Sequence, residues 1–184
     1  MIRKFRLFAR DSRGIAAIEM AFIMPVLLLL YFGLFDLTAM ITLSRKVTYS
    51  SSVVADLVTQ NETTVTPAKI TDYFNAAELV MSPTPIANVR IEVYGFRNIA
   101  GIITQRFSKS STGGTSCGAA PSTAGMASLM TDGNDLVVAR VCTSYTPYIA
   151  TFLGENILGS TSFTLSEEIA LRPRMTATLD CPTC

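Results

Sequence analysis

One apolar run near the N-terminus, from Ile15 to Leu34, constrains the chain more than any other feature. At about 1.5 Å of rise per residue, a helix over this run is about 30 Å long, which matches the hydrocarbon core of a bilayer. The run holds one acidic residue, Glu19, five positions after Gly14. An acidic side chain inside a membrane-spanning helix costs about 2.5 to 3.5 kcal/mol. The sequence therefore predicts a membrane-spanning segment whose Glu19 carboxylate needs a partner.

The charges around the apolar run predict its orientation. The residues that precede it are mostly basic, namely Arg3, Lys4, Arg6, Arg10 and Arg13 against Asp11. Because basic flanks remain in the cytoplasm, we expect the N-terminus there and the chain after Leu34 on the other side of the membrane. We expect the basic arm to act as a topology signal and to contact anionic membrane lipid rather than nucleic acid, because a basic arm beside a membrane span rarely binds nucleic acid.

The residues around Gly14 carry a family resemblance. Gly14, the apolar residues up to Ile18 and then Glu19 resemble the site cut by prepilin peptidases in type IV pilins and pseudopilins. The longer stretch 10–22, with Pro25, is similar to the opening of TadE-like proteins, the minor pseudopilins of tight-adherence (Flp) pilus systems. The stretches 141–148 and 163–173 resemble the back half of TadE-like proteins more loosely.

This resemblance implies a cleavage between Gly14 and Ile15 on the cytoplasmic face of the membrane. A residue without a side chain agrees with this, because its backbone can lie close to the protease carboxylates. Cleavage would place the new ammonium of Ile15 about one helical turn from Glu19. In an assembly inside lipid, Glu19 would then pair with the ammonium of a neighbouring subunit.

The resemblance also implies partners and a location. The partners are prepilin peptidase, other pilins or pseudopilins, and the pilus assembly platform. The location is the bacterial inner membrane, with a single span, a cytoplasmic N-terminus and a periplasmic C-terminal domain, or the pilus itself. The expected function is that of a minor pseudopilin that assists assembly of a tight-adherence pilus.

Other interpretations of the N-terminus remain open. The chain is alternatively an unprocessed, single-pass envelope scaffold or adaptor, whose Glu19 is protonated or reaches the interface. Met20 follows Glu19, at a position where relatives more often carry an aromatic residue. The sequence therefore does not distinguish a TadE-like from a TadF-like subtype. A secretory signal removed at Ala39 is disfavoured, because the apolar run is longer than about 15 residues and Leu37 is too bulky for a small-x-small site.

The chain has 184 residues, enough for one ordinary domain after the membrane segment. We expect a cytoplasmic leader over 1–14, a transmembrane helix over 15–36, an amphipathic continuation of that helix over 37–60, and a periplasmic α+β domain over 61–184. The continuation is indicated by residues that recur at alternating spacings of three and four, namely Leu37, Met40, Ser44, Val47, Ser51, Val54 and Val58. Its stripe suits packing against a sheet or against another subunit.

A second helix is predicted where Thr66 can serve as N-cap and Pro67 as first helical residue. Ser82-Pro83 ends it. Its apolar face is expected to hold Ile70, Tyr73, Phe74, Ala77 and either Val80 or Met81.

Four segments predict an antiparallel sheet packed against the long helix. Residues 89–96 alternate with period two, which indicates a half-buried strand with Val89, Ile91 and Val93 inward. Residues 102–107 are expected to return antiparallel, 135–145 to form a central strand and 162–172 a last strand. A long loop is expected over 108–127, and a short helix or compact loop over 149–158.

The chain has 4 cysteines, and in an exported domain they are expected to form disulfides. Of the three possible pairings, we expect Cys117 with Cys142 and Cys181 with Cys184, because the last two are tethered close together. The Cys181-Pro182-Thr183-Cys184 spacing also occurs in redox-active and zinc-binding pairs. A membrane-tethered thiol oxidoreductase is therefore a further alternative, but the first thiol lacks a following helix to lower its pKa.

Nothing in the sequence indicates an enzyme. The chain has 0 histidines, and it contains no phosphate-binding loop or serine elbow. Glu167 and Glu168 are adjacent in a predicted strand and point to opposite faces. The acidic residues around Gly133 fit a turn better than a calcium loop. We expect no catalytic residue, no cofactor and no metal.

Overall fold

The computed structural model describes residues 13–114, 116–153 and 162–184. These residues form two compact units. The helical unit comprises Met1–Ala39 and Pro147–Thr161, and the sheet unit comprises Met40–Thr146 and Ser162–Cys184. The leader that we expect before Gly14 lies largely outside the described residues. So does the second part of the helix or loop expected over 149–158.

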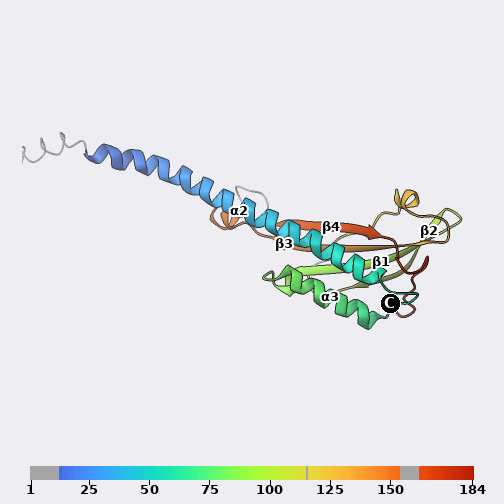
Figure 1. The fold of residues 1–184 in the computed structure, drawn as a ribbon. Coiled ribbons are helices and arrows are strands. Elements are labelled where there is room, and N and C mark those ends of the chain that lie inside the picture. Colours follow the sequence, from blue (N-terminus) through green and yellow to red (C-terminus); the bar gives the residue numbers. More distant parts are fainter. Residues whose placement is uncertain (1–12, 115, 154–161) are drawn as a thin grey trace, which may run out of the picture. The chain divides into compact units, whose positions relative to one another are not determined.

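The longest element is helix α2 (Arg13–Thr59), which passes through both units without a break (Figure 1). The predicted long helix is therefore confirmed, and it ends one residue before the expected Gln60. Pro25 lies inside it and leaves the Ala21 carbonyl without its helical donor. Membrane helices tolerate such a proline when neighbouring groups satisfy the carbonyl.

The second half of α2 belongs to the core of the sheet unit. Val47, Val54 and Val58 are fully buried, as the predicted stripe requires, and Ser51 is buried with them. Leu37, at the start of the same predicted stripe, is exposed. The stripe therefore packs against the sheet of its own chain from Val47 onward.

Helix α3 (Pro67–Met81) follows the prediction at both ends. The Thr66 hydroxyl accepts a hydrogen bond from the Lys69 amide, and Pro67 occupies the first turn, where its missing N–H has no partner to lose. The buried face ends in Met81 rather than Val80, and its members are Ile70, Phe74, Ala77 and Met81.

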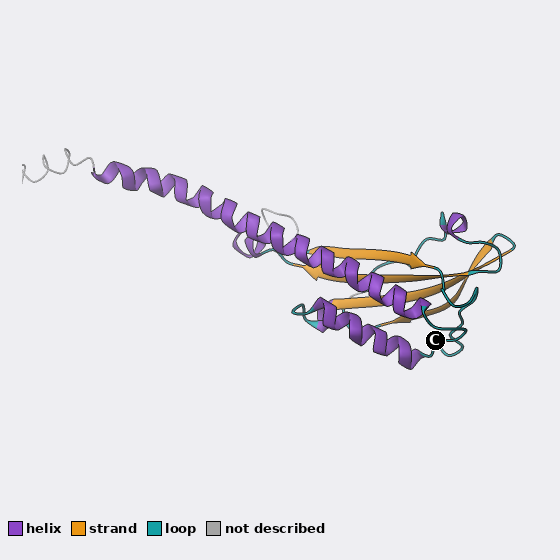
Figure 2. Ribbon diagram, viewed as in Figure 1, coloured by secondary structure: helices purple, strands orange, loops and turns teal. Residues whose placement is uncertain are grey.

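Four antiparallel strands form one sheet in the order β2-β1-β3-β4 (Figure 2). The strands are β1 (Val89–Ile99), β2 (Ile102–Ser110), β3 (Asp135–Tyr145) and β4 (Phe163–Leu171). Ala100 and Gly101 have φ angles of 52° and 84° and form the tight turn between β1 and β2. The α+β fold with an antiparallel sheet is confirmed.

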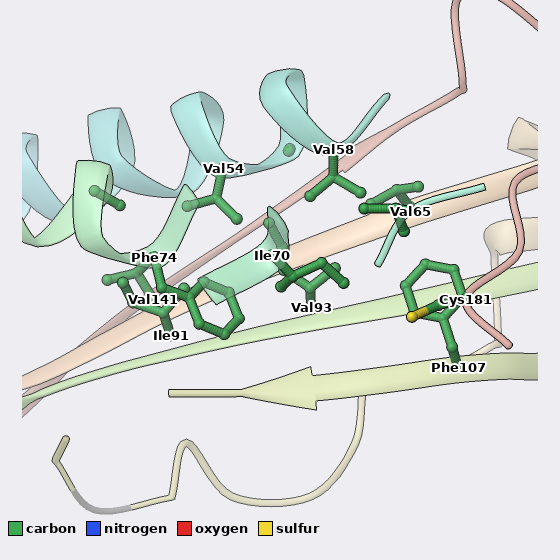
Figure 3. Close-up of a cluster of buried hydrophobic side chains, with 14 of the residues drawn as sticks. Val54, Val58, Val65, Ile70, Phe74, Ile91, Val93, Phe107, Val141 and Cys181 are labelled. Carbon is green, nitrogen blue, oxygen red and sulfur yellow. The ribbon is translucent and has the colours of Figure 1, made fainter. Parts of the chain in front are cut away.

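Two layers cover the two faces of this sheet. The second half of α2 and α3 pack on one face, where Ile91, Val93 and Val141 of the sheet share one buried cluster with Val54, Val58, Ile70 and Phe74 (Figure 3). On the other face, Met126 and Met130 pack on Phe96, Leu136 and Val138. Met126 begins the short 3₁₀ helix η2 (Met126–Leu129) in the segment between β2 and β3. A further 3₁₀ turn, η1 (Ile86–Asn88), precedes β1.

The expectation of a half-buried β1 is wrong. Val89, Ile91 and Val93 do point into the helix-covered core, but Glu92 on the opposite face is also buried. The long loop after β2 lies over that face and removes it from solvent. Strand β1 is therefore buried on both sides, as is usual for a central strand.

The C-terminal segment closes the end of the sheet unit. Thr64 and Asp180 form a parallel bridge, and the Val65 amide donates to the Asp180 carbonyl over 3.0 Å. The Arg174 amide donates to the Thr59 carbonyl at the last residue of α2. The bond to Thr59 gives a partner to a carbonyl that the end of α2 would otherwise leave unpaired.

Candidate functional site

Gly14 and Ile15 lie in the first turn of α2. A Cβ atom added to Gly14 would meet no heavy atom within 4 Å among the described residues. Its φ is not in the left-handed region, so neither space nor backbone conformation requires a glycine here. The described residues therefore impose no steric requirement for a glycine at position 14.

Glu19 lies one helical turn after Ile15, so both residues are on the same face of α2. Both are exposed. Among the described residues, no cation forms an ion pair with the Glu19 carboxylate. An ionised carboxylate without a countercharge is unfavourable in lipid.

The surface around Glu19 is apolar on every side of α2. Ile18, Phe22 and Ile23 are exposed, and Phe22 reaches 78%. Exposed apolar residues continue around the helix as far as Leu34. Such a surface is stable in lipid or against other apolar helices and unfavourable in water.

An unpredicted contact occurs where the apolar part of α2 ends. Asp36 accepts hydrogen bonds from the backbone amides of Tyr148 and Ile149, at the start of helix α4 (Tyr148–Leu153), over 2.8 Å each. The Phe35 and Tyr148 rings lie 5.6 Å apart. Asp36 thus caps a helix that follows it by 112 positions. The only hint in the sequence is an acid directly after an apolar run, which does not name its partner.

The four cysteines form the two disulfides that we expected from the sequence. Cys117 is bonded to Cys142, and Cys181 to Cys184. Cys142 is buried in β3, whereas Cys117 lies in the loop after β2. The first disulfide therefore fastens this loop to the sheet face that it covers. The second lies in the C-terminal segment, where Cys181 contributes to the main core.

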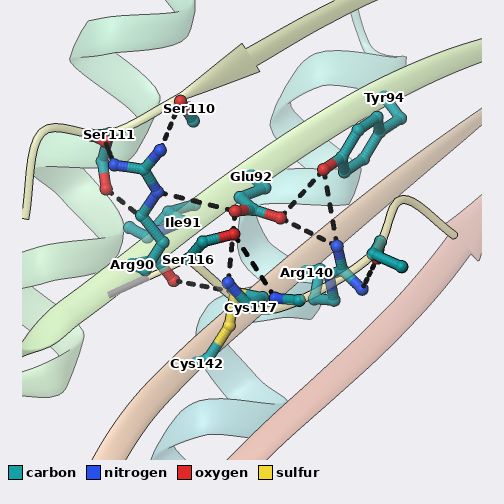
Figure 4. The surroundings of a disulfide bond; sticks show 12 residues. Arg90, Ile91, Glu92, Tyr94, Ser110, Ser111, Ser116, Cys117, Arg140 and Cys142 are labelled. Carbon is teal, nitrogen blue, oxygen red and sulfur yellow. Dashed lines mark hydrogen bonds and ion pairs between the residues drawn. A yellow bond between two sulfur atoms is a disulfide. The ribbon is translucent and has the colours of Figure 1, made fainter. Parts of the chain in front are cut away.

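Beside the Cys117–Cys142 bond, a buried polar cluster joins the loop to the sheet (Figure 4). Glu92 accepts from Arg140 and from the Tyr94 hydroxyl, over 2.9 Å each. The amide of Cys117 donates to the other oxygen of Glu92 over 3.4 Å, and Arg140 donates to the Ala119 carbonyl over 2.8 Å. The cluster and the disulfide hold the same stretch of loop.

The cluster stabilises charged forms in a buried place. Burial by itself raises the pKa of Glu92, but the hydrogen bonds from Arg140 and its other neighbours outweigh burial and hold that pKa below its usual value. Burial and the hydrogen bond to Glu92 raise the pKa of Tyr94. Both polar atoms of the Glu92 side chain have partners, which favours a structural role for this carboxylate over a chemical one.

A second ion cluster lies further along the two central strands, where β3 begins at Asp135 and pairs with Arg97. Arg97 donates to both oxygens of Asp135, over 2.6 and 2.7 Å, and to Asp180 over 3.2 Å. Its hydrogen bonds to Asp135 raise the pKa of Arg97 further above its ordinary value. Asp135 also accepts from the Leu179 amide, so the cluster ties the C-terminal segment to the sheet. Within the described residues, no group of three or more histidine, cysteine or acidic side chains is placed to hold a metal ion.

These features define a protein with an apolar N-terminal helix, exposed on all sides, that continues into a disulfide-bonded α+β domain. In the part of the chain that the structure describes, α2 alone is long and apolar enough to span a membrane, which fits a single-pass anchor. Residues 14–56 match the family model of TadE-like protein, so this segment is a TadE-like domain. The match supports involvement in a tight-adherence pilus system and association with pilus assembly components. No curated protein and no solved structure matches the chain.

Proposed function

We propose that the protein is a minor pseudopilin that prepilin peptidase cuts after Gly14 and that assists assembly of a tight-adherence (Flp) pilus. In this proposal the leader is cytoplasmic, α2 is held in the bacterial inner membrane, and the sheet unit lies in the periplasm. The role is non-enzymatic. The TadE-like segment at 14–56 supports this proposal, because it begins at the expected cleavage position.

The observation that carries the proposal is the exposed Glu19 carboxylate on an apolar helix, one turn from Ile15, without an ion pair in the described part of the chain. Cleavage after Gly14 creates an ammonium group on Ile15. That cation, on a neighbouring subunit, can pair with Glu19 within lipid and remove two uncompensated charges. The same pairing sets the stagger between neighbouring helices.

Gly14 supports the cleavage step independently. Gly14 and Gly33 are both helical glycines, and a Cβ added to either one meets no heavy atom within 4 Å among the residues that the structure describes. Neither position therefore requires a glycine to avoid a clash at Cβ. Comparing substitutions at Gly14 and Gly33 therefore distinguishes a glycine that the peptidase requires from one that the fold requires.

The first experiment determines the N-terminal residue of the protein extracted from its native membrane. Ile15 as first residue is expected, and Met1 would instead indicate the unprocessed envelope scaffold. Gly14→Leu is expected to abolish cleavage, whereas Gly33→Leu leaves it intact. Equal processing of both variants contradicts a role for Gly14.

A second experiment tests Glu19. Glu19→Ala removes the carboxylate, and we expect loss of co-purification with partner pilins. Glu19→Asp keeps the charge and serves as the matched control, with association partly retained. If Glu19→Ala is processed and assembles as the unchanged protein does, the charge-pairing mechanism is wrong.

A further inference from the structure

We propose that the first turn of α4 is an interfacial anchor that rests on the outer surface of the membrane and fixes how deeply α2 is inserted. Its partner is lipid, at the boundary between headgroups and acyl chains. The proposal requires α2 to be a membrane anchor, but it does not require cleavage after Gly14. It concerns residues of the helical unit alone.

The connection between the two helices has a defined geometry. Both oxygens of Asp36 accept backbone N–H groups of α4, from Tyr148 and Ile149, over 2.8 Å each. Asp36 is only 6% exposed, and Ala150, two residues after Tyr148, is also buried. The contact between the Phe35 and Tyr148 rings adds a second point of attachment. Tyr148 is therefore held at a fixed level along α2.

That level coincides with the expected end of the membrane span. A span that begins at Ile15 reaches about 30 Å at Leu34, and Asp36 follows within one turn. Tyr31, Phe35 and Tyr148 lie within about a turn of that point, and all three are exposed, Phe35 by 52% and Tyr148 by 57%. Aromatic residues are enriched at this depth, where an apolar ring meets the polar headgroups.

The charge distribution favours lipid as the partner. Between Ile15 and Ser44 the only charged residues are Glu19 and Asp36, and the segment 146–154 has none. The Asp36 carboxylate accepts from the first backbone amides of α4, which have no partner within their own helix. Neither group is then left unpaired at the membrane edge, where water is scarce. The described side chains exposed here are Leu34, Phe35 and Tyr148, which are apolar or aromatic.

The chain contains 0 tryptophans, so a single introduced tryptophan reports on its own position. We would place Tyr148→Trp in the full chain, reconstituted in phosphatidylcholine and phosphatidylglycerol vesicles. The lipids carry bromine, which quenches tryptophan, either near the headgroup or near the end of the acyl chain. We expect blue-shifted emission and a larger loss of intensity with bromine near the headgroup.

Two matched reporters calibrate the depth. Phe22→Trp, in the middle of the span, is expected to lose more intensity with bromine near the chain end. Tyr49→Trp, at an exposed position of the sheet unit well beyond the expected end of the span, is expected to be quenched by neither lipid. Quenching of Phe22→Trp without quenching of Tyr148→Trp overturns the interfacial anchor alone. If neither Phe22→Trp nor Tyr148→Trp is quenched, the membrane anchor itself is overturned.

The role of Asp36 is tested in the same background. Asp36→Asn keeps the shape of the side chain but leaves one acceptor oxygen for two N–H donors. We expect the emission of Tyr148→Trp to shift to the red and its quenching to be lost, while Phe22→Trp with Asp36→Asn stays quenched. Unchanged quenching of Tyr148→Trp in the Asp36→Asn chain overturns the proposed attachment. Blue-shifted emission without quenching by either lipid means that protein covers Tyr148, which also overturns the proposal.

Discussion

Glu92 and Arg140 face each other across β1 and β3, with Oε2 of Glu92 and Nη2 of Arg140 2.9 Å apart. Glu92 is 4% exposed, although it lies on the sheet face that strand periodicity leaves to solvent. The loop fastened by the Cys117–Cys142 bond covers the pair. The ion pair and the loop therefore depend on each other, because neither charge is favourable under the loop without its partner.

Glu92→Gln is expected to lower the free energy of unfolding by about 3 to 5 kcal/mol, because it leaves the Arg140 guanidinium buried without a countercharge. Chemical denaturation of the full chain in detergent micelles measures the change. Glu168→Gln is the matched control. Glu168 is the register partner of Arg140 on the other neighbouring strand, but it is exposed. Its substitution is expected to change stability by less than about 0.5 kcal/mol.

The stabilising effect of Glu92 is also expected to depend on pH. Because folding lowers the pKa of Glu92 from its ordinary value of 4.5, the carboxylate contributes stability above that pH. This contribution is lost as the pH falls through the lower pKa of the folded state. The difference in stability between the unchanged protein and Glu92→Gln should therefore be constant near neutral pH and shrink below about pH 4. A difference that grows on acidification contradicts the assignment.

The two disulfides are expected to contribute unequally. The residues of the Cys117–Cys142 bond are separated by 25 positions, and those of Cys181–Cys184 by 3. Because a longer closed loop restricts the unfolded chain more, the Cys117→Ser/Cys142→Ser variant should lose about 3.5 kcal/mol and the Cys181→Ser/Cys184→Ser variant about 2 kcal/mol. Denaturation of both variants gives the order. Mass spectrometry without reduction checks the starting state, and four free thiols there would refute both bonds.

Sequence patterns predicted the elements whose cause is local. The Thr66-Pro67 start of α3 and the Ser82-Pro83 end each act within one turn, so α3 was predictable to the residue. The burial of Val47, Val54 and Val58 follows from helical spacing. The disulfide pairing followed from tethering at the C-terminus.

Features that depend on distant parts of the chain could not be predicted in this way. Asp36 and Tyr148 meet across 112 positions, and no periodicity relates them. Glu92 was expected on a solvated face because the loop that buries it lacks a regular pattern. At the proposed assembly site, the spacing of Gly14 and Glu19 marks both residues in the sequence, and the role proposed for them stays a prediction.

We expect the stability of the sheet unit to depend on the guanidinium group of Arg97 and not only on its positive charge. Arg97→Lys keeps one positive charge but cannot form two parallel bonds to Asp135 while also reaching Asp180. We expect a loss of about 1 to 3 kcal/mol and faster proteolysis of the C-terminal segment. Arg106→Lys is the matched control, because Arg106 is exposed and contacts Asp180 over 3.5 Å alone. Equal effects of the two substitutions would contradict a special role for the bond to Asp135.

Gly95 is expected to be required by the ring of Phe107. The two residues are partners in the β1–β2 register, and a Cβ on Gly95 would lie 2.2 Å from Cε1 of Phe107. Phe107 is buried, so its ring cannot move away without disturbing the main core. Gly95→Ala should therefore lower the free energy of unfolding by about 1 to 3 kcal/mol. In a Phe107→Leu background the smaller side chain leaves room, and the cost of Gly95→Ala should fall by at least about 0.5 kcal/mol. Additive effects in this double-mutant cycle would show that steric exclusion by Phe107 is not the reason for the glycine.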